Sequence, residues 1–207
     1  MAVKQVLSFS GSKPQRDAYR VPVRYLVVWL PSFSLERCGY TERECVVLCT
    51  FQRNALRVIE AMPAAQDAGI RIGMTVSESR ALCPRVVMEM WCREEESRDW
   101  DSLLEGFRCY SDRIQRGTNS ELVLEVSRTA HLFGGETGVV RAVRERAMSL
   151  GHQCGVGLSD HPRAALIWAR SGSGGVIPAG QGGTYLAPMP FHALGASDGL
   201  TRAIQVL

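Results

Sequence analysis

The chain has 207 residues, 45% of them hydrophobic and 22% charged, so it is long enough to bury a sizeable core. Its formal net charge of +3 excludes a strongly basic nucleic-acid-binding arm and an acidic tail protein. The whole excess comes from residues 1–20, and the rest of the chain is formally neutral.

No stretch is apolar for long enough to span a membrane, and the N-terminus lacks the apolar core of a signal peptide. We therefore expect a cytoplasmic protein with no membrane partner. The seven cysteines form no CxxC pair and no tight cluster with histidines, which argues against a zinc site. We expect reduced thiols, no bound metal and no cofactor.

The first half of the chain begins with polar, aperiodic residues 1–20, which we interpret as a flexible tail. The apolar run 25–30 predicts a buried strand, and the shorter runs 45–49 and 56–59 predict two more.

Two helix starts follow. Pro63 opens a short helix that stops at Gly69. Thr75 and Glu78 have the spacing of a capping box, which predicts a second helix that ends before Pro84.

The second half continues the alternation: we expect an amphipathic helix over 95–111, a strand at 122–126, a helix over 139–150, a strand at 154–158 and a helix over 162–170. Six glycines between 172 and 183 then predict a linker. Alternating strands and helices are typical of an α/β or α+β protein.

Six short motifs occur in the order in which they occur in Y-family (translesion) DNA polymerases. They are Leu30-Pro31, Ala68–Thr75, Arg80–Pro84, Ala130–Glu136, Val156–Ser159 and Leu186–Pro190. The chain therefore resembles the palm and fingers of that family over about residues 25–195. Within the family it is most similar to the ImuB type, the catalytically inactive, polymerase-like subunit of a bacterial mutagenesis complex.

The resemblance implies a ferredoxin-like palm at 21–34 and 86–172 and a small fingers subdomain at 35–85. Residues 173–207 would form a linker and the start of a thumb, cut short. The family's little-finger domain is expected to be absent.

Family members bind two magnesium ions through carboxylates at the end of the first strand and at the start of a later one. The resemblance places Trp29 and Pro31 at the first pair of positions, and Ser120 and Glu121 at the second. Magnesium prefers hard oxygen ligands, and only Glu121 supplies a carboxylate. Glu121 is either a relic ligand or a solvent-facing strand residue. We expect no catalytic metal site.

The positions that meet the incoming nucleotide are also changed. The triphosphate positions fall on Pro63, Gln66 and Ser173, and the position beside the sugar falls on Ser34. Phosphate recognition needs cations or N–H donors, and these side chains are poor substitutes. The resemblance thus implies a protein that is not an enzyme.

Four arginines lie where the family's fingers and palm meet template or primer, and they are either weak DNA contacts or surface charge: Arg53, Arg57, Arg71 and Arg163. The run Ser159-Asp160-His161 contains the residue types of a hydrolase triad, but three chain neighbours do not normally point into one relay. His131 is interpreted as a core or turn histidine.

The resemblance implies a scaffold in DNA-damage-induced mutagenesis, cytoplasmic and nucleoid-associated in a bacterium. Its expected partners are a RecA-like subunit (ImuA type), an error-prone C-family DNA polymerase and the sliding clamp. The last two would bind through C-terminal regions absent here. Two alternatives stay open: a residual translesion polymerase, and a module that binds primer–template DNA.

Overall fold

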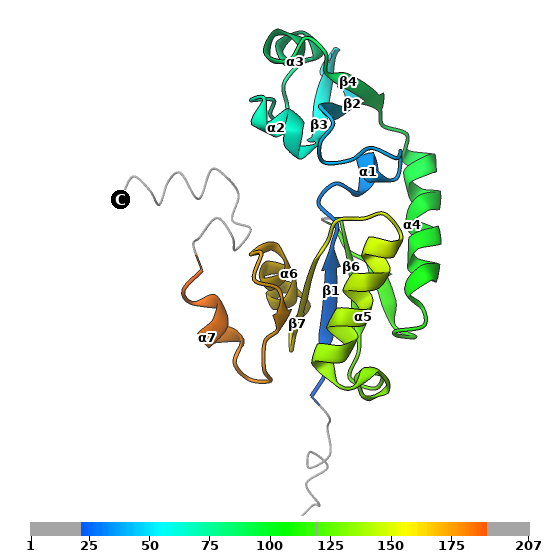
Figure 1. Cartoon of the computed structure of the whole chain (residues 1–207), viewed down its shortest axis with the longest axis vertical. Helices are drawn as coiled ribbons and strands as arrows, with labels where there is room; N and C mark the ends of the chain where they lie inside the picture. The colour runs from blue at the N-terminus through cyan, green and yellow to red at the C-terminus, as the bar shows by residue number, and fades with distance from the viewer. Residues whose placement is uncertain (1–21, 119, 190–207) are drawn as a thin grey trace, which may run out of the picture.

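The computed structural model describes residues 22–118 and 120–189, which form two units, each built on one sheet. The large sheet has the strand order β5-β6-β1-β7-β8, and the small sheet has the order β3-β2-β4. Figure 1 shows the small unit above the large one, with helix α4 running alongside. The predicted tail at 1–20 lies outside the described residues. Among the helices of the described ranges, none is long and apolar enough to cross a membrane.

The large sheet is centred on β1, because both β6 and β7 pair with it in antiparallel fashion. Its strands are β1 (Tyr25–Trp29), β5 (Ile114–Arg116), β6 (Glu121–Glu125), β7 (Gly155–Ser159) and β8 (Gly175–Val176). Three helices flank the sheet: α4 (Arg93–Phe107), α5 (Glu136–Ser149) and α6 (Pro162–Arg170).

Side chains alternate between the two faces of the large sheet. Leu26 and Val28 are fully buried in one cluster with residues of α4 and α5, including Trp100. Phe33 completes this core, with its ring centroid 4.1 Å from that of Trp100. The opposite face of β1 and β7 carries α6, as the two sides of the sheet in Figure 1 show.

Helix α6 lies so close to β7 that side chains do not fit between them. A Cβ built on Gly157 would lie 2.2 Å from the carbonyl oxygen of Ala165 and 2.9 Å from the amide nitrogen of Ala169. We therefore expect Gly157→Ala to push α6 outward and to lower the free energy of unfolding by about 2 kcal/mol in urea denaturation. Gly183→Ala is the matched control, because a Cβ there meets no atom within 4 Å. Equal stability of the two variants would contradict the prediction.

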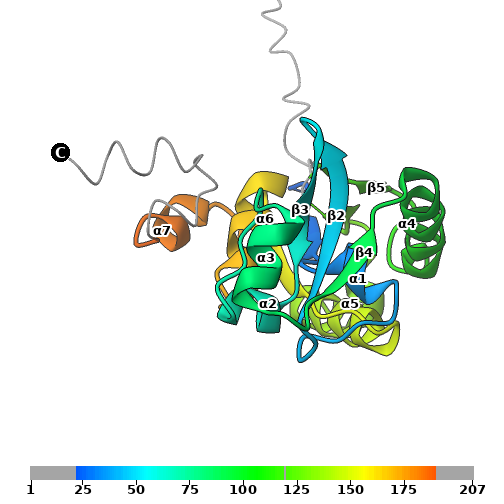
Figure 2. The same ribbon diagram turned by 90° about the horizontal axis from the view of Figure 1, so that it is seen from above.

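The small sheet contains β2 (Val46–Gln52), β3 (Ala55–Ala61) and β4 (Val87–Met90). Two helices pack beside it, α2 (Pro63–Asp67) and α3 (Val76–Leu82), which Figure 2 shows from above. The predicted capping box is confirmed, since the Thr75 side chain accepts from the Glu78 amide and the Glu78 carboxylate accepts from the Thr75 amide. Helix α1 (Phe33–Glu36) and α4 connect the two units.

The predicted strands and helices are confirmed in type and order, and the fold is mixed α/β. The helix predicted over 95–111 ends at Phe107, and the one predicted over 139–150 begins at Glu136. Six short elements of the described ranges have no periodic signal: α1, β4, β5, the 3-10 turn η1 (Ala130–Phe133), β8 and α7 (Gly182–Leu186).

Two boundaries drawn from the sequence need correction. Strand β4 lies beyond residue 85, yet it pairs with β2 in the small sheet, so the fingers-like unit extends to Met90. The glycine-rich segment interpreted as a linker holds β8, which pairs with β7 and completes the large sheet. Both strands are too short to show alternation, and their hydrogen bonds come from a neighbouring strand.

A buried arginine at the edge of β1 holds the β8 segment in place. The Arg24 guanidinium bonds Glu136 at the start of α5 (Nε to Oε1, 2.6 Å) and Asp160 after β7 (Nη1 to Oδ1, 2.6 Å). It also donates to the Ile177 carbonyl at 2.6 Å, while the Gly180 amide donates to Asp160 at 2.6 Å. The ion pairs and these hydrogen bonds together join four segments of the chain.

Candidate functional site

The positions assigned to the family's metal ligands meet at one end of the large sheet. Trp29 on β1 and Glu121 on β6 are direct cross-strand partners. The next residues also touch, since the Leu30 amide donates to the Ser120 carbonyl at 2.9 Å. The strand register thus brings together the two chain segments to which the resemblance assigns the family's metal-ligand positions.

The side chains at these positions are a poor set of magnesium ligands. Trp29 is an indole, and the Arg170 guanidinium lies over it, 5.5 Å from the ring centroid. Pro31 is exposed and has no polar side-chain atom, and Ser120 offers one hydroxyl. One carboxylate beside a guanidinium does not fit a pair of divalent cations. Within the described ranges, no group of three or more His, Cys, Asp and Glu side chains is arranged to hold a metal ion.

Glu121 is buried, with only 5% of its surface exposed. The alternative of a solvent-facing strand residue is therefore wrong. Its side chain folds against Gly117, where a Cβ would collide with the carboxylate. The glycine in the turn before β6 makes room for the carboxylate, a packing effect that strand alternation alone does not reveal.

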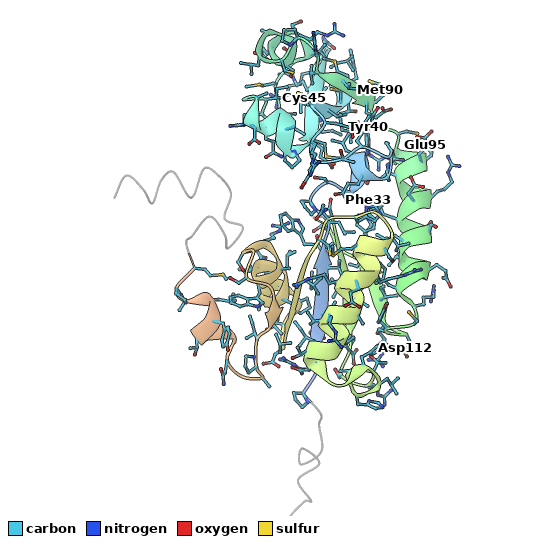
Figure 3. The ribbon with its side chains drawn as sticks, viewed as in Figure 1. Phe33, Tyr40, Cys45, Met90, Glu95 and Asp112 are labelled. Carbon is cyan, nitrogen blue, oxygen red and sulfur yellow. The ribbon has the colours of Figure 1, made fainter. Side chains whose placement is uncertain are left out.

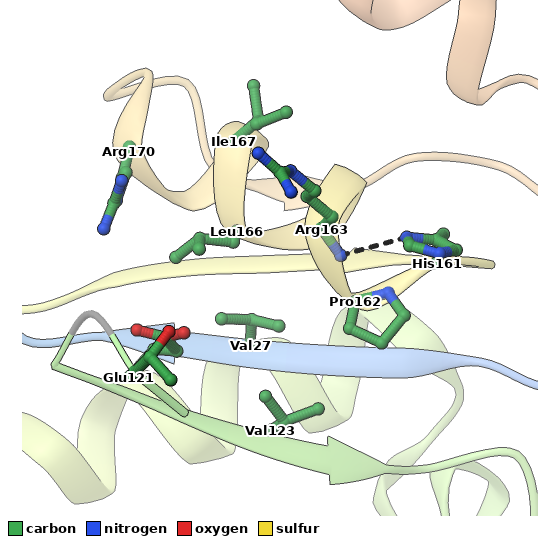
Figure 4. A pocket seen from close by; sticks show the side chains of 10 residues that line it. Val27, Glu121, Val123, His161, Pro162, Arg163, Leu166, Ile167 and Arg170 are labelled. Atoms are coloured by element: carbon green, nitrogen blue, oxygen red, sulfur yellow. Dashed lines mark hydrogen bonds between the residues drawn. The ribbon is translucent and has the colours of Figure 1, made fainter. Parts of the chain in front are cut away.

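A pocket of about 360 Å³ lies between α6 and the open face of β1 and β6, and Figure 4 shows it from close by. It mixes apolar side chains of the sheet with charged side chains of α6. Its lining residues are Val27, Thr118, Glu121, Val123, His161, Pro162, Arg163, Leu166, Ile167 and Arg170. The pocket therefore includes the retained carboxylate and one of the four candidate arginines.

The three triphosphate positions lie on α2 and in the turn after α6. Pro63 and Gln66 lie on α2, and the Gln66 side-chain amide (Nε2) donates to the Ala61 carbonyl at 2.7 Å. Ser173 lies in the exposed turn after α6, where its own amide donates to the Ser171 hydroxyl at 3.3 Å. None of these side chains is a cation.

The position beside the sugar, Ser34, is buried at the junction of the two units and faces carboxylates. Its hydroxyl donates to Glu96 Oε2 at 3.2 Å, and the adjacent Leu35 amide donates to Glu60 at 3.3 Å. Glu36 lies nearby and accepts from His152 Nδ1 at 3.1 Å. We call Glu36, Glu60 and Glu96 the carboxylate cluster.

Burial acts on two carboxylates of this cluster with different outcomes. It raises the pKa of Glu60 to about 7, and the charges of Glu96 and Glu36 add to the rise. Burial also disfavours the charged form of Glu96, but hydrogen bonds from Trp91 and Arg116 outweigh it and lower that pKa. The cluster was not foreseen, because its members come from α1, β3 and α4, and no local motif links them.

The four candidate DNA-contacting arginines are divided between the units. Arg57 donates to the Gly73 carbonyl at 2.8 Å and Arg71 to the Ile70 carbonyl at 3.0 Å, so both contact the loop before α3. Arg53 lies exposed in the β2–β3 turn, and Arg163 lies on α6. The structure thus brings together two of the four.

The Ser159-Asp160-His161 run forms no relay. Ser159 is 2% exposed on β7, Asp160 binds Arg24, and His161 accepts from the Arg163 amide at the start of α6. His131 lies exposed in the 3-10 turn, consistent with a turn histidine.

Comparisons with known proteins identify the family and the fold of the chain. Residues 33–170 match the model of the impB/mucB/samB family. The fold is similar to the crystal structure of DinB from Sulfolobus solfataricus (TM-score 0.72, 16% identity) and to the insertion ternary complex of Dbh DNA polymerase (TM-score 0.74, 17% identity). Both matches cover 88% of this chain and 57% of the other, so the chain spans less than two thirds of those proteins. A search of curated proteins found no match.

The family match covers well over half of the chain, and the structural matches extend over both sheets. The chain therefore belongs to the impB/mucB/samB family and has the fold of a Y-family DNA polymerase core.

Proposed function

We propose that this protein is a non-catalytic member of its family that acts as a scaffold in DNA-damage-induced mutagenesis, as the ImuB type does. The observation that carries the proposal is the pairing of Trp29 with Glu121 beneath the Arg170 guanidinium. A bulky indole and a cation occupy the place where the family needs two carboxylates. The fold is retained, and the ligand chemistry is replaced.

The carboxylate cluster supports the same proposal. An incoming nucleoside triphosphate carries several negative charges and needs cations nearby. Ser34 here faces Glu60 and Glu96, and the triphosphate positions carry no cation. A triphosphate placed beside Ser34 would therefore meet like charges rather than compensating ones.

A manganese titration with a primer-extension assay tests the proposal. We expect the native chain to show no saturable Mn²⁺ binding in the millimolar range and no extension with Mg²⁺ or Mn²⁺. The double variant Trp29→Asp, Ser120→Asp is expected to gain saturable binding, because it restores carboxylates beside Glu121. Saturable binding by the native chain that Glu121→Ala abolishes would instead favour the residual polymerase.

The proposed partners are a RecA-like subunit, an error-prone C-family polymerase and a sliding clamp. Pull-down of the RecA-like subunit by this chain supports the scaffold directly. The DNA-binding alternative is distinguished by titrating primer–template DNA at several salt concentrations. Several phosphate contacts produce a steep salt dependence, whereas a scaffold that makes few produces a shallow one.

A further inference from the structure

The two sulfurs of Cys45 and Cys83 lie 3.0 Å apart in the small unit. Cys45 immediately precedes β2, and Cys83 is the C-terminal cap of α3. Figure 3 labels Cys45 within this unit. Both side chains are half-buried and pack against the apolar core between the small sheet and its helices.

The backbone holds both cysteines in this arrangement. The Val87 amide of β4 donates to the Cys45 carbonyl at 2.9 Å, and the Val86 amide donates to the Cys83 carbonyl at 3.1 Å. The Cys83 amide in turn donates to the Ser79 carbonyl in α3 at 2.9 Å. Both residues are thus anchored through one short turn, so their contact follows from the local fold. A disulfide needs the sulfurs to approach by only about 1 Å more.

The other five cysteines are placed differently. Cys38 and Cys109 are exposed, and Cys49 is buried on β2. Cys92 contacts the Glu94 carboxylate at 3.4 Å, and Cys154 is half-buried at the start of β7. Reduced thiols are expected from the sequence at all seven positions, and the 3.0 Å contact between their sulfurs distinguishes Cys45 and Cys83 from the other five.

We propose that Cys45 and Cys83 form a reversible intramolecular disulfide when the protein meets a low-molecular-weight disulfide. One protein sulfur, as its thiolate, attacks the small disulfide and expels one small thiolate, which leaves a mixed disulfide. The second protein sulfur then attacks the first, expels the other small thiolate and closes the protein disulfide. Each protein sulfur loses one electron, each reagent sulfur gains one, and the two protons lost by the cysteines leave with the two expelled thiols.

Closure would fasten the end of α3 to the start of β2. The segment between the two cysteines contains β2, β3, α2 and α3. Such a bond restricts the unfolded chain, and we expect the oxidised protein to melt on the order of 5 °C higher than the reduced one. The small unit would then respond to the thiol–disulfide balance of the cell, where stable disulfides are rare and redox-active ones are the usual kind.

Burial and the neighbouring Cys83 thiol raise the pKa of Cys45 to about 11. The thiolate is the reactive form, so oxidation is expected to be slow at neutral pH and to become faster as the pH rises towards 9.

The experiment equilibrates the full chain in glutathione buffers of increasing oxidised fraction and maps disulfides by trypsin digestion and mass spectrometry. We expect a link between the tryptic peptides 44–53 and 81–85, reversed by dithiothreitol. Because peptide 44–53 also contains Cys49, Cys49→Ala is the matched control and should keep the link. Cys45→Ala and Cys83→Ala should each abolish both the link and the rise in melting temperature.

The melting temperature of each variant in its reduced form shows that it is folded. Two results overturn the proposal. One is a native chain that yields only glutathione adducts and no linked peptides at any buffer ratio. The other is a link that survives in Cys45→Ala but is lost in Cys49→Ala.

Discussion

Replacement of Arg24 by methionine is expected to lower the free energy of unfolding by about 3 kcal/mol, near the lower end of the range for breaking a buried ion pair. Methionine keeps much of the apolar stem but removes every donor. Glu136 and Asp160 would then face each other without a cation, and the Ile177 carbonyl would lose its partner. The two carboxylate side chains are about a third exposed, so water offsets part of the loss.

Urea denaturation at pH 7 measures this effect, and Arg113→Met provides the control. Arg113 pairs with Glu125 at 2.8 Å at the edge of the same sheet, but its side chain is 62% exposed. An exposed pair contributes little, so the control should lose much less stability than Arg24→Met. Arg24→Lys should recover only part of the loss, since an ammonium cannot reproduce the planar fork that meets Glu136 twice. Equal losses for Arg24→Met and Arg113→Met would contradict the prediction.

The Arg24 network also explains why β8 was not predicted from the sequence. A glycine-rich run has no apolar periodicity, and on local grounds a linker is the natural interpretation. The segment is ordered by partners elsewhere in the chain: β7 supplies the ladder, with the Ile177 amide donating to the Leu158 carbonyl at 2.8 Å. Arg24 and Asp160 then hold Ile177 and Gly180, which lie just after β8. Local propensity cannot reveal a strand that exists only through such contacts.

Elements with strong local signals were predictable. The capping box at Thr75 and the proline that opens α6 each mark a helix start through backbone chemistry that needs no tertiary partner. The continuous apolar run of β1 marked the central strand of the large sheet, because a strand covered on both faces needs no polar side chains.

The sequence predicts which residues occupy the candidate site, but not how their side chains pack. The family resemblance assigns metal-ligand positions to Trp29 and Glu121, and the register of β1 and β6 makes them neighbours. The burial of Glu121 and the stacking of Arg170 on Trp29 depend on the turn at Gly117 and on the packing of α6. The carboxylate cluster forms where α1, β3 and α4 of the two units pack together, and no local sequence pattern predicts such a contact.

The burial of Glu60 at the junction of the two units makes the stability of the protein depend on pH. The pKa of Glu60 is raised from its usual 4.5 to about 7 in the folded protein, chiefly by burial. The folded state therefore binds the Glu60 proton more tightly than the unfolded state does. The contribution to stability is full below about pH 4.5, falls as the pH rises towards 7, and changes little above that.

Glu60→Gln should remove this dependence. We expect the variant to be more stable than the native chain by about 2 kcal/mol at pH 8, with the difference shrinking steadily as the pH falls to 5. A neutral amide keeps an oxygen acceptor for the Leu35 amide and carries no charge to desolvate. Urea denaturation of both proteins from pH 5 to pH 8 measures the change.

The window from pH 5 to pH 8 isolates Glu60 from most other carboxylates. Asp160 and Glu96 have lowered pKa values, Asp160 first through the Gly180 amide and Glu96 through Trp91 and Arg116 against the opposing effect of burial, so both stay charged throughout. Glu95→Gln is the matched control, because it removes the same charge from a side chain that is 56% exposed at the start of α4. Two results would contradict the prediction: a difference in the free energy of unfolding between Glu60→Gln and the native chain that does not change with pH, or the same pH-dependent difference in Glu95→Gln. Either would show that the Glu60 carboxylate stays charged beside Ser34 from pH 5 to pH 8.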